Sequence, residues 1–202
     1  MLTIIDYGMG NLGSLLNMLK RIGVNAVIGS ELDQIKKAEK IVLPGVGSFD
    51  AGMHYINTMP GLRDVLEEKV MLEKVPTLGV CLGMQLFTQG SEEGRHAGLG
   101  WISGHTRRFP RYDGLKVPHM GWNIAIANTA SPLTVGAGKE PRYYFAHSYY
   151  VEVENPAHSV SKTHYGLSFD SAVAKDNIYG VQFHPEKSHR FGSKILKNFA
   201  EL

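Results

Sequence analysis

Apolar residues follow two different patterns along the first 80 positions. Short continuous apolar runs, which favour buried β-strands, lie at residues 2–5, 26–28, 41–43 and 77–80. Between these runs apolar residues recur every three or four positions, which favours helices at 12–22, 31–37 and 62–72. Ser30 stands where its side chain can cap the second helix. Strands that alternate with helices predict a mostly parallel, doubly wound sheet.

The second half of the chain has more glycine and aromatic residues, and its strand-like runs lie closer together. These runs are 107–109, 123–126, 142–146, 149–153, 172–175 and 178–183. Their short spacing predicts a more antiparallel portion, and a last helix is expected at 191–199. Repeats, low-complexity tracts and linkers are absent from the sequence. We therefore expect an α/β fold with a mixed, mostly parallel sheet and flanking helices, in a single domain spanning residues 1–202.

Composition and charge exclude several classes of protein. Hydrophobic residues make up 43% of the chain and charged residues 20%, as in globular proteins, and the net charge of +2 gives no indication of nucleic-acid binding. The sequence has no apolar run long enough for a membrane span, and its first residues lack the basic start and the longer apolar run expected of a signal peptide. Its single cysteine, Cys81, cannot form an internal disulfide. We expect a soluble, cytoplasmic protein without nucleic-acid or membrane partners.

The segment Gly79-Val80-Cys81-Leu82-Gly83 joins the fourth expected strand to helix-forming residues. It has the G-x-C-x-G form of a nucleophile elbow, the cysteine counterpart of G-x-S-x-G. In such a turn the sulfur is exposed at the carboxyl edge of the sheet, and the positive end of the next helix favours the thiolate. The alternative is a buried core cysteine, the usual fate of a lone cysteine. The strand before Cys81 and the helix after it favour the nucleophile.

A thiol nucleophile needs a base, and the base needs a group that orients it. The best placed of the nine histidines is His184, which is followed by Pro185 and Glu186. Because Pro185 favours an extended residue before it, His184 and Glu186 should lie side by side, with the free ring nitrogen facing Cys81. The alternatives are an exposed loop histidine, a solvated glutamate or a metal site. A metal site is disfavoured because no second His or Cys cluster stands at ligand spacing.

A glycine-rich loop, residues 44–47, follows the third expected strand, which Pro44 and Gly45 should end. The loop should therefore emerge at the same edge of the sheet as Cys81. Its backbone N–H groups can turn inward as donors for the tetrahedral intermediate of acyl transfer. The N–H of Leu82 is the expected second donor, as in other elbows. An ordinary βα turn is the alternative interpretation of the loop.

Together these motifs resemble class I glutamine amidotransferases, and most closely the HisH glutaminase subunit of imidazole glycerol phosphate synthase. The matching segments are IDYGMGN at 5–11, PGVGSF at 44–49, GVCLGMQ at 79–85, PHMGWN at 118–123, HSY at 147–149 and GVQFHPEKS at 180–188. They span nearly the whole chain, and their combination is much more specific than any one of them. The resemblance implies a flavodoxin-like glutamine amidotransferase fold.

The resemblance also implies a role for each site residue. It implies a catalytic triad of Cys81, His184 and Glu186, which hydrolyses glutamine to glutamate and ammonia. It implies that glutamine is bound by Gly45, Gln85, Ser148 and Tyr149. It implies oxyanion donors at Val46, Gly47 and Leu82. Since two glycines flank Val46, we expect this loop to be misaligned until partner and ligand bind. The resemblance implies no cofactor and no metal.

A partner protein follows from the same resemblance. Asn11, Trp122 and Lys187 are expected on a face that docks a HisF-like cyclase subunit, a (β/α)8 barrel. Ammonia would pass through this barrel to a phosphoribosyl-derived substrate, giving imidazole glycerol phosphate in histidine biosynthesis. Some relatives instead supply ammonia for amidino-sugar synthesis in surface polysaccharide. Residues 188–192 resemble those relatives, so both acceptors stay open.

One motif favours a different class of protein. Gly8, Gly10 and Gly13 form a G-x-G-x-x-G after a strand, and Glu31 lies where a dinucleotide-binding oxidoreductase has its ribose-binding acid. That interpretation leaves the three triad residues unexplained. A cysteine peptidase with the same elbow often has a histidine directly after the nucleophile, where this chain has Leu82. A non-catalytic binding subunit would have no need of an intact triad.

Overall fold

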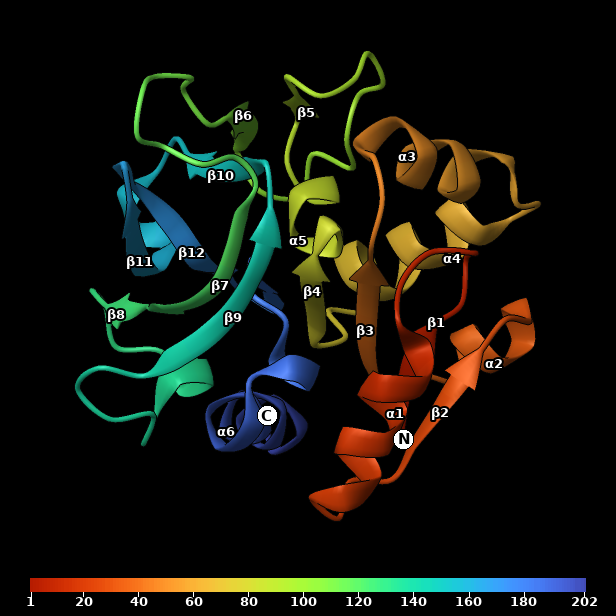
Figure 1. Ribbon diagram of the computed structural model, residues 1–202. Helices are drawn as coiled ribbons and strands as arrows, with labels where there is room; N and C mark the ends of the chain where they lie inside the picture. The colour runs from red at the N-terminus through yellow and green to blue at the C-terminus, as the bar shows by residue number, and fades with distance from the viewer.

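An eleven-stranded mixed sheet runs through the computed structural model, which describes residues 1–202 (Figure 1). Its first five strands are parallel and lie in the order β2-β1-β3-β4-β13. Their bounds are Leu2–Ile5 for β1, Ala26–Gly29 for β2, Lys40–Gly45 for β3, Thr77–Cys81 for β4 and Ile178–Val181 for β13. This part of the molecule is the doubly wound sheet expected from the alternating pattern.

Beyond β13 the sheet becomes antiparallel, as the second half of the sequence predicted. It continues through β12 (Leu167–Lys175), β10 (Tyr149–Val153) and β6 (Gly104–Arg108), and β5 (Gly90–Ser91) pairs in parallel with β6. On a side branch, β11 (Ser159–Tyr165) pairs with β12 and with the short β8 (Ile126–Ala127). A separate two-stranded ribbon joins β7 (His119–Ile124) to β9 (Arg142–His147).

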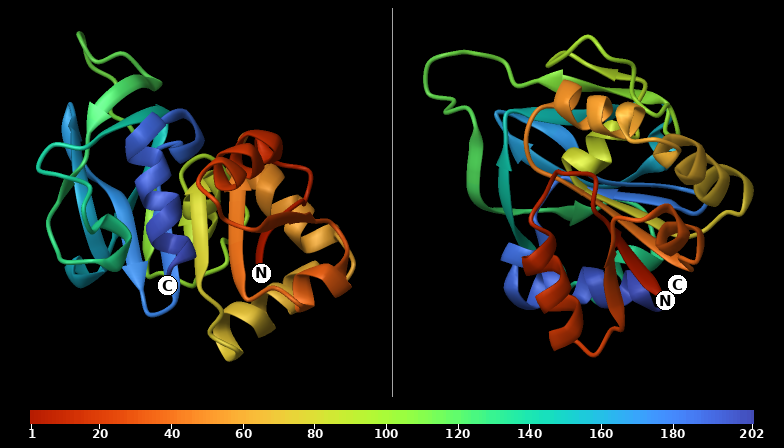
Figure 2. Two further views of the ribbon diagram at one scale, coloured as in Figure 1. Left: turned by 90° about the horizontal axis from the view of Figure 1, so that it is seen from below. Right: turned by 90° about the vertical axis from the view of Figure 1, so that its right-hand side faces the viewer.

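Helices cover both faces of the parallel strands (Figure 2). One face carries α1 (Leu12–Arg21) and α6 (His189–Ala200). The other carries α2 (Leu32–Lys36), α3 (Phe49–Thr58), α4 (Leu62–Glu67) and α5 (Leu82–Leu86). A π-helical turn, Glu68–Leu72, extends α4, and three short 3₁₀ turns lie at Pro132–Thr134, Pro156–His158 and Pro185–Lys187. None of these helices combines the length and the apolar character that crossing a membrane requires.

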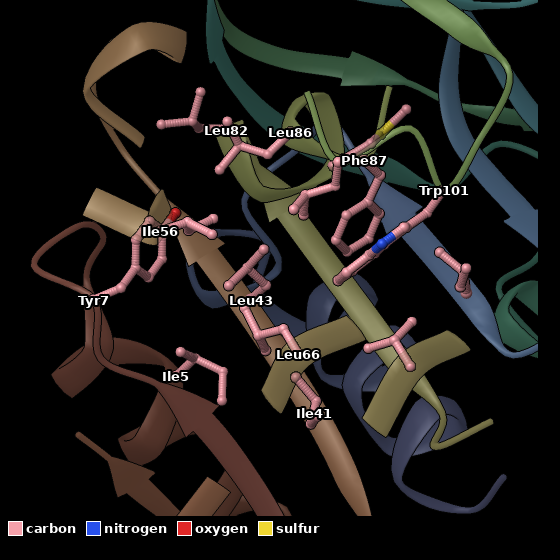
Figure 3. Packing of buried hydrophobic residues seen from close by; sticks show 14 of the residues in the cluster. Ile5, Tyr7, Ile41, Leu43, Ile56, Leu66, Leu82, Leu86, Phe87 and Trp101 are labelled. Carbon is pink, nitrogen blue, oxygen red and sulfur yellow. The ribbon is translucent and has the colours of Figure 1, made fainter. Parts of the chain in front are cut away.

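Two apolar clusters form the core, one on each face of the sheet. Along β3, Ile41 and Leu43 point into the first cluster and Val42 into the second, because successive side chains of a strand face opposite ways. The first cluster also contains residues from α3, α4 and α5 (Figure 3), and the second contains residues from α1 and α6. Each fully buried side chain of this size contributes roughly 1.5–3 kcal/mol to folding.

Some expected elements differ in the structure. The sequence had predicted no element at α3 or at β11, and the structure has a helix and a strand there. The expected helix 62–72 ends in a π turn, and the expected strand 123–126 begins earlier, at residue 119. Ser30 is not the cap of α2, because Glu31 occupies that position and the side-chain oxygen of Gln34 accepts from its backbone N–H.

The carboxyl ends of three parallel strands meet at one edge of the sheet. Pro44 and Gly45 do not stop β3 as expected but form its last two positions, where Gly45 is the register partner of Cys81. On the other side of β4, Val181 of β13 is the partner of Val80, and His184 follows three residues later. The loop after β3, the end of β4 and the segment after β13 are therefore held side by side.

Candidate active site

Cys81 is the last residue of β4 and directly precedes α5. Its backbone has φ 54° and ψ −109°, a conformation that is uncommon for a non-glycine residue and stores strain. The residue is only 6% exposed, yet it lines a cavity at the carboxyl edge of the sheet. The turn thus has the sharp, strained backbone of a nucleophile elbow.

The two glycines of this turn allow close packing. A Cβ on Gly83 would lie 1.9 Å from the carbonyl oxygen of Leu43, and a Cβ on Gly79 would lie 2.6 Å from the backbone nitrogen of Met84. Neither glycine has a positive φ. The motif had suggested that the two glycines are needed for the sharp turn. In the structure they instead let α5 approach β3 and β4 closely, and this packing holds Cys81 at the edge of the sheet.

His184 lies beside Cys81 and is oriented by Glu186. The ring nitrogen Nδ1 of His184 is 2.9 Å from Oε1 of Glu186, and both side chains are almost fully buried. The segment is anchored by the backbone N–H of His184, which donates to the carbonyl of Tyr144 (2.8 Å), and by the hydroxyl of Ser188, which donates to the carbonyl of His184 (2.6 Å). With Nδ1 engaged, Nε2 is the ring nitrogen left for Cys81.

The charge state of His184 reflects its two neighbours. Burial lowers the pKa of His184, but hydrogen bonds to Cys81 and Glu186 and the negative charges of both outweigh burial and raise this pKa to about 10. The imidazolium is therefore favoured at neutral pH, next to the sulfur of Cys81. Such a pair supplies a nucleophile and a proton donor at the same place.

The loop after β3 lies against the elbow. Gly45 packs so closely on Leu82 that a Cβ at Gly45 would lie 2.7 Å from the Cβ of Leu82. The hydroxyl of buried Tyr7 donates to the carbonyl of Pro44 at 2.6 Å, which fixes the start of the loop. Gly47 has φ 131°, in the region that favours glycine. Val46 is 53% exposed, so the loop is held at its base and open at its tip.

One cavity of about 270 Å³ brings together most of the residues selected from the sequence. It is lined by the expected residues Val46, Gly47, Cys81, Leu82, Gln85, Ser148, Tyr149, His184 and Lys187. Glu186 lies behind His184, and Gly45 lies beneath the loop, outside the lining. The volume suits a small polar molecule of the size of an amino acid.

Gln85 projects from α5 into this cavity with its amide group fixed. Its Nε2 donates to the carbonyl of Tyr149 (3.1 Å) and to Oε1 of Gln182 (3.0 Å), so both of its N–H groups are used. Gln85 therefore ties the elbow helix to Tyr149 on the opposite wall. Its oxygen remains available to a ligand.

A buried histidine pair supports the same wall. The ring nitrogen Nδ1 of His119 is 3.0 Å from Nε2 of His147, whose Nδ1 is 2.7 Å from the carbonyl of Tyr149. Because that carbonyl can only accept, His147 donates to it and accepts from His119. Burial lowers the pKa of His147 to about 3 and that of His119 to about 4, so the pair stays neutral.

Comparison with known proteins identifies the family of this chain. The family model of glutamine amidotransferase class I matches residues 3–202. The chain belongs to the class I glutamine amidotransferase family. It is 50% identical over 202 residues to the imidazole glycerol phosphate synthase subunit HisH 2 of Pseudomonas aeruginosa, covering 100% of both chains. It is 51% identical over 199 residues to the protein of the same name from Methanococcus maripaludis, covering 98% of both.

Solved structures of amidotransferases share the fold. A glutamine amidotransferase superposes with a TM-score of 0.76 at 14% identity, covering 99% of both chains. A glutamine amidotransferase of Thermotoga maritima gives 0.64 at 15% identity, covering 99% of this chain and 82% of that one. These likenesses concern the fold, and they confirm the expected α/β class with a mixed sheet and flanking helices.

The cavity of this glutamine amidotransferase also contains a charged residue that sequence reasoning missed. Glu93 lies in a loop without helical or strand periodicity, so no local signal marked it. Its Oε2 accepts from the backbone N–H of Phe49 (2.7 Å) at the start of α3, and burial raises the pKa of Glu93. A carboxylate in this position can bind an ammonium group. No cluster of three or more His, Cys, Asp or Glu side chains is arranged to hold a metal ion.

The three residues expected at a partner interface of this amidotransferase occupy different positions. Lys187 is exposed at the cavity, with its Nζ 5.7 Å from the centre of the Tyr144 ring. Trp122 is 47% exposed on β7, and its ring lies parallel to that of His189 at 5.4 Å. Asn11 caps α1, because its side chain accepts from the backbone N–H of Ser14 (3.4 Å), and so it lies away from the cavity lining.

Proposed function

We propose that this chain is a HisH-type glutaminase subunit of an imidazole glycerol phosphate synthase, which releases ammonia from glutamine through Cys81, His184 and Glu186. The observation that carries the proposal is the strained Cys81 beside the buried His184–Glu186 pair, at one end of an amino-acid-sized cavity. Identities of 50% and 51% over essentially full-length HisH proteins support this role. The cytoplasm suits this reaction, since the nucleophilic thiol must stay reduced.

Glutamine would enter with its side-chain amide directed at Cys81. Glu93 and the oxygen of Gln85 would accept from its α-ammonium group. Ser148 and Tyr149 would bind the α-carboxylate through the backbone, and Tyr149 is held by the histidine pair and by Gln85. The walls of the cavity supply these groups at fixed positions, so glutamine loses little further freedom when it reacts.

The chemistry would then follow in two steps. The Cys81 thiolate attacks the carboxamide carbon, and the oxyanion is stabilised by backbone N–H groups of the 45–47 loop and of Leu82. His184 protonates the leaving nitrogen, the C–N bond breaks, and ammonia departs from a glutamyl thioester. Water next attacks the thioester carbon and gives a proton to His184. The C–S bond breaks, glutamate leaves, and the electron pair returns to sulfur.

The mouth of the cavity would be covered by a cyclase subunit. Val46 and Met120 line the cavity yet are 53% and 65% exposed, which is unusual for apolar side chains beside a catalytic cysteine. A HisF-like (β/α)8 barrel seated here would receive ammonia directly and would bear on the open tip of the 45–47 loop. We expect this contact to align the loop and to stimulate glutaminase activity.

The test is glutamate release from glutamine by the chain alone, with a histidine-pathway cyclase subunit, and with Cys81→Ala in the same mixture. The proposal predicts strong stimulation by the cyclase and complete loss in Cys81→Ala, with cyclase alone as the blank. Cys81-dependent activity that this cyclase does not stimulate would support the glutaminase activity but indicate another acceptor of ammonia, for example in the amidino-sugar pathway. No glutaminase activity under any condition would overturn the proposal.

A further inference from the structure

The side-chain amide of Gln182 lies in direct contact with the sulfur of Cys81. Gln182 follows β13, and its backbone N–H continues the pairing with β12 by donating to the carbonyl of Ser171 (2.9 Å). The residue is completely buried, and its Nε2 is 3.7 Å from Sγ of Cys81. The sequence places Gln182 two residues before His184, so extended backbone points both side chains toward the same edge.

The hydrogen-bond network fixes which end of this amide faces the sulfur. The chain of bonds begins at the carbonyl of Tyr149, which can only accept, so the atom of Gln85 that faces it is the amide nitrogen. The same nitrogen donates its second hydrogen to Gln182, which must therefore present its oxygen to Gln85. The NH₂ group of Gln182 is consequently directed at Cys81, and the opposite orientation would leave two donors facing each other.

We propose that Gln182 is a further catalytic residue of the glutaminase, whose amide N–H stabilises the Cys81 thiolate, and that Gln85 is the positioning residue that orients it. This assignment rests on the proposed function. The thiolate lies in a buried site where few water molecules can solvate it, so a fixed N–H donor has a large effect there. His184 approaches the sulfur as a cation, and Gln182 adds a neutral donor that cannot lose its proton.

Such a donor matters at both ends of the reaction. Before attack, it increases the fraction of Cys81 that is ionised. During hydrolysis of the thioester, His184 has taken a proton from water, the C–S bond breaks and its electron pair returns to sulfur. The N–H of Gln182 then stabilises the departing thiolate. A neutral thioester sulfur gains much less from the same donor, so Gln182 favours the ionised form of the sulfur in particular.

The competing explanation is that Gln182 only holds Gln85 in place for glutamine binding. In that case its loss would raise KM and leave the sulfur unchanged. The two explanations separate because Cys81 is the only cysteine, so every alkylation event reports on this one sulfur. The rate of alkylation by iodoacetamide, measured against pH, follows the ionised fraction of Cys81 without any need for glutamine or a cyclase.

The first experiment compares Gln182→Met with the unmodified chain and with Gln89→Met. Gln89 is an exposed glutamine outside the cavity, so it provides the same exchange as a control. The assignment predicts that Gln182→Met moves the pH midpoint of alkylation upward by about one unit and slows alkylation about tenfold at pH values below both midpoints. Gln89→Met should match the unmodified chain. A Gln182→Met midpoint equal to that of the control, with only KM raised, would overturn the assignment.

A second measurement uses the unmodified chain, in case Gln182→Met fails to fold. The side-chain NH₂ resonances of Gln182, followed by NMR in ¹⁵N-labelled protein, should shift over the same pH range as alkylation, and this shift should vanish in Cys81→Ala. Resonances that ignore the ionisation of Cys81 would refute the contact. Neither readout requires turnover, so absent glutamate release would count against the proposed function alone.

Discussion

Glu186 contacts Nδ1 of His184, on the side of the ring away from Cys81. The contribution of Glu186 to activity can therefore be measured through the pKa of His184. Glu186→Gln keeps the hydrogen-bonding shape and removes the charge. Because Glu186 is one of the groups that raise the pKa of His184 to about 10, its neutralisation should lower that pKa by about one unit or more. The alkaline limb of the kcat/KM profile should move down accordingly, and kcat/KM should fall about tenfold or more.

Glu201→Gln provides the matched control, since Glu201 is an exposed glutamate that pairs only with Lys197 on α6. Its profile should coincide with that of the unmodified chain. If Glu186→Gln loses activity but keeps the alkaline limb in place, Glu186 positions His184 without affecting its charge.

The role of a single residue was predictable where its neighbours in the sequence indicate it. Cys81 stands between two glycines, and His184 and Glu186 stand two positions apart, so spacing alone suggested their partnership. Glu93 carries no such signal, and the position of Gln182 two residues before His184 does not by itself show a contact with Cys81. Glu93 acquires its place from a hydrogen bond to Phe49, 44 positions away, and Gln182 from a contact with Cys81, 101 positions away. Contacts of this range depend on the complete fold.

The packing between α5 and the sheet determines whether the elbow can form. Gly83→Ala would place a Cβ 1.9 Å from the carbonyl oxygen of Leu43, a backbone atom that cannot move aside. We expect the substitution to lower the free energy of unfolding by more than about 3 kcal/mol or to prevent folding. Gly13→Ala on α1 meets no atom within 4 Å and should stabilise the helix by up to about 1 kcal/mol. Urea denaturation of both variants checks the contrast, and equal stabilities would contradict it.

Pairing of β7 with β9 places His119 opposite His147, and this buried pair should make the fold acid-sensitive. The folded-state pKa of His147, about 3, is below its unfolded value near 6.5, so only the unfolded chain binds the proton between these values. The contribution of His147 to the free energy of unfolding is fully present above pH 6.5 and is lost as the pH falls toward 3. His184 has a raised pKa and acts in the opposite direction, so the effect must be measured by difference.

His147→Asn removes the titrating ring and keeps a donor where Nδ1 meets the carbonyl of Tyr149. Between pH 7 and pH 5 the unmodified chain should lose roughly 1–2 kcal/mol more unfolding free energy than this variant. His54→Asn, the same exchange at an exposed histidine, should retain the full acid sensitivity. Identical pH dependence in all three proteins would show that His147 is not the group responsible.

Elements were predictable wherever burial imposes a clear period. The strands β1, β3 and β4 are continuous apolar runs, because both of their faces are covered, and the alternation with helices led directly to the parallel sheet. The hydrophobic pattern did not predict elements that depend on contacts with distant parts of the chain. β11 is rich in serine and threonine and is held by β12, and the cap of α2 depends on a hydrogen bond from the backbone of Glu31 to Gln34. Neither interaction is visible as a hydrophobic period.

At the scale of the whole molecule, the candidate active site and an exposed apolar rim, formed by Met120 and Trp122, lie at the same edge of the sheet. Met120 and Trp122 are two positions apart on β7 and so point to the same side, where Trp122 pairs across the ribbon with Tyr144 and Tyr144 contacts Lys187. Met120 also lines the cavity. The rim is therefore continuous with the mouth of the cavity, and a partner seated on it would close the site to water.

Trp122→Ala tests whether this rim binds the cyclase. Removing a half-exposed tryptophan from the centre of an interface should weaken cyclase binding about tenfold or more, since buried aromatic anchors carry much of the affinity. Leu72→Ala is the control, because Leu72 is 78% exposed and precedes the opposite end of β4. Titration of glutaminase stimulation with the cyclase measures both. Equal dissociation constants for the two variants would show that the docking surface lies elsewhere than on the exposed apolar rim.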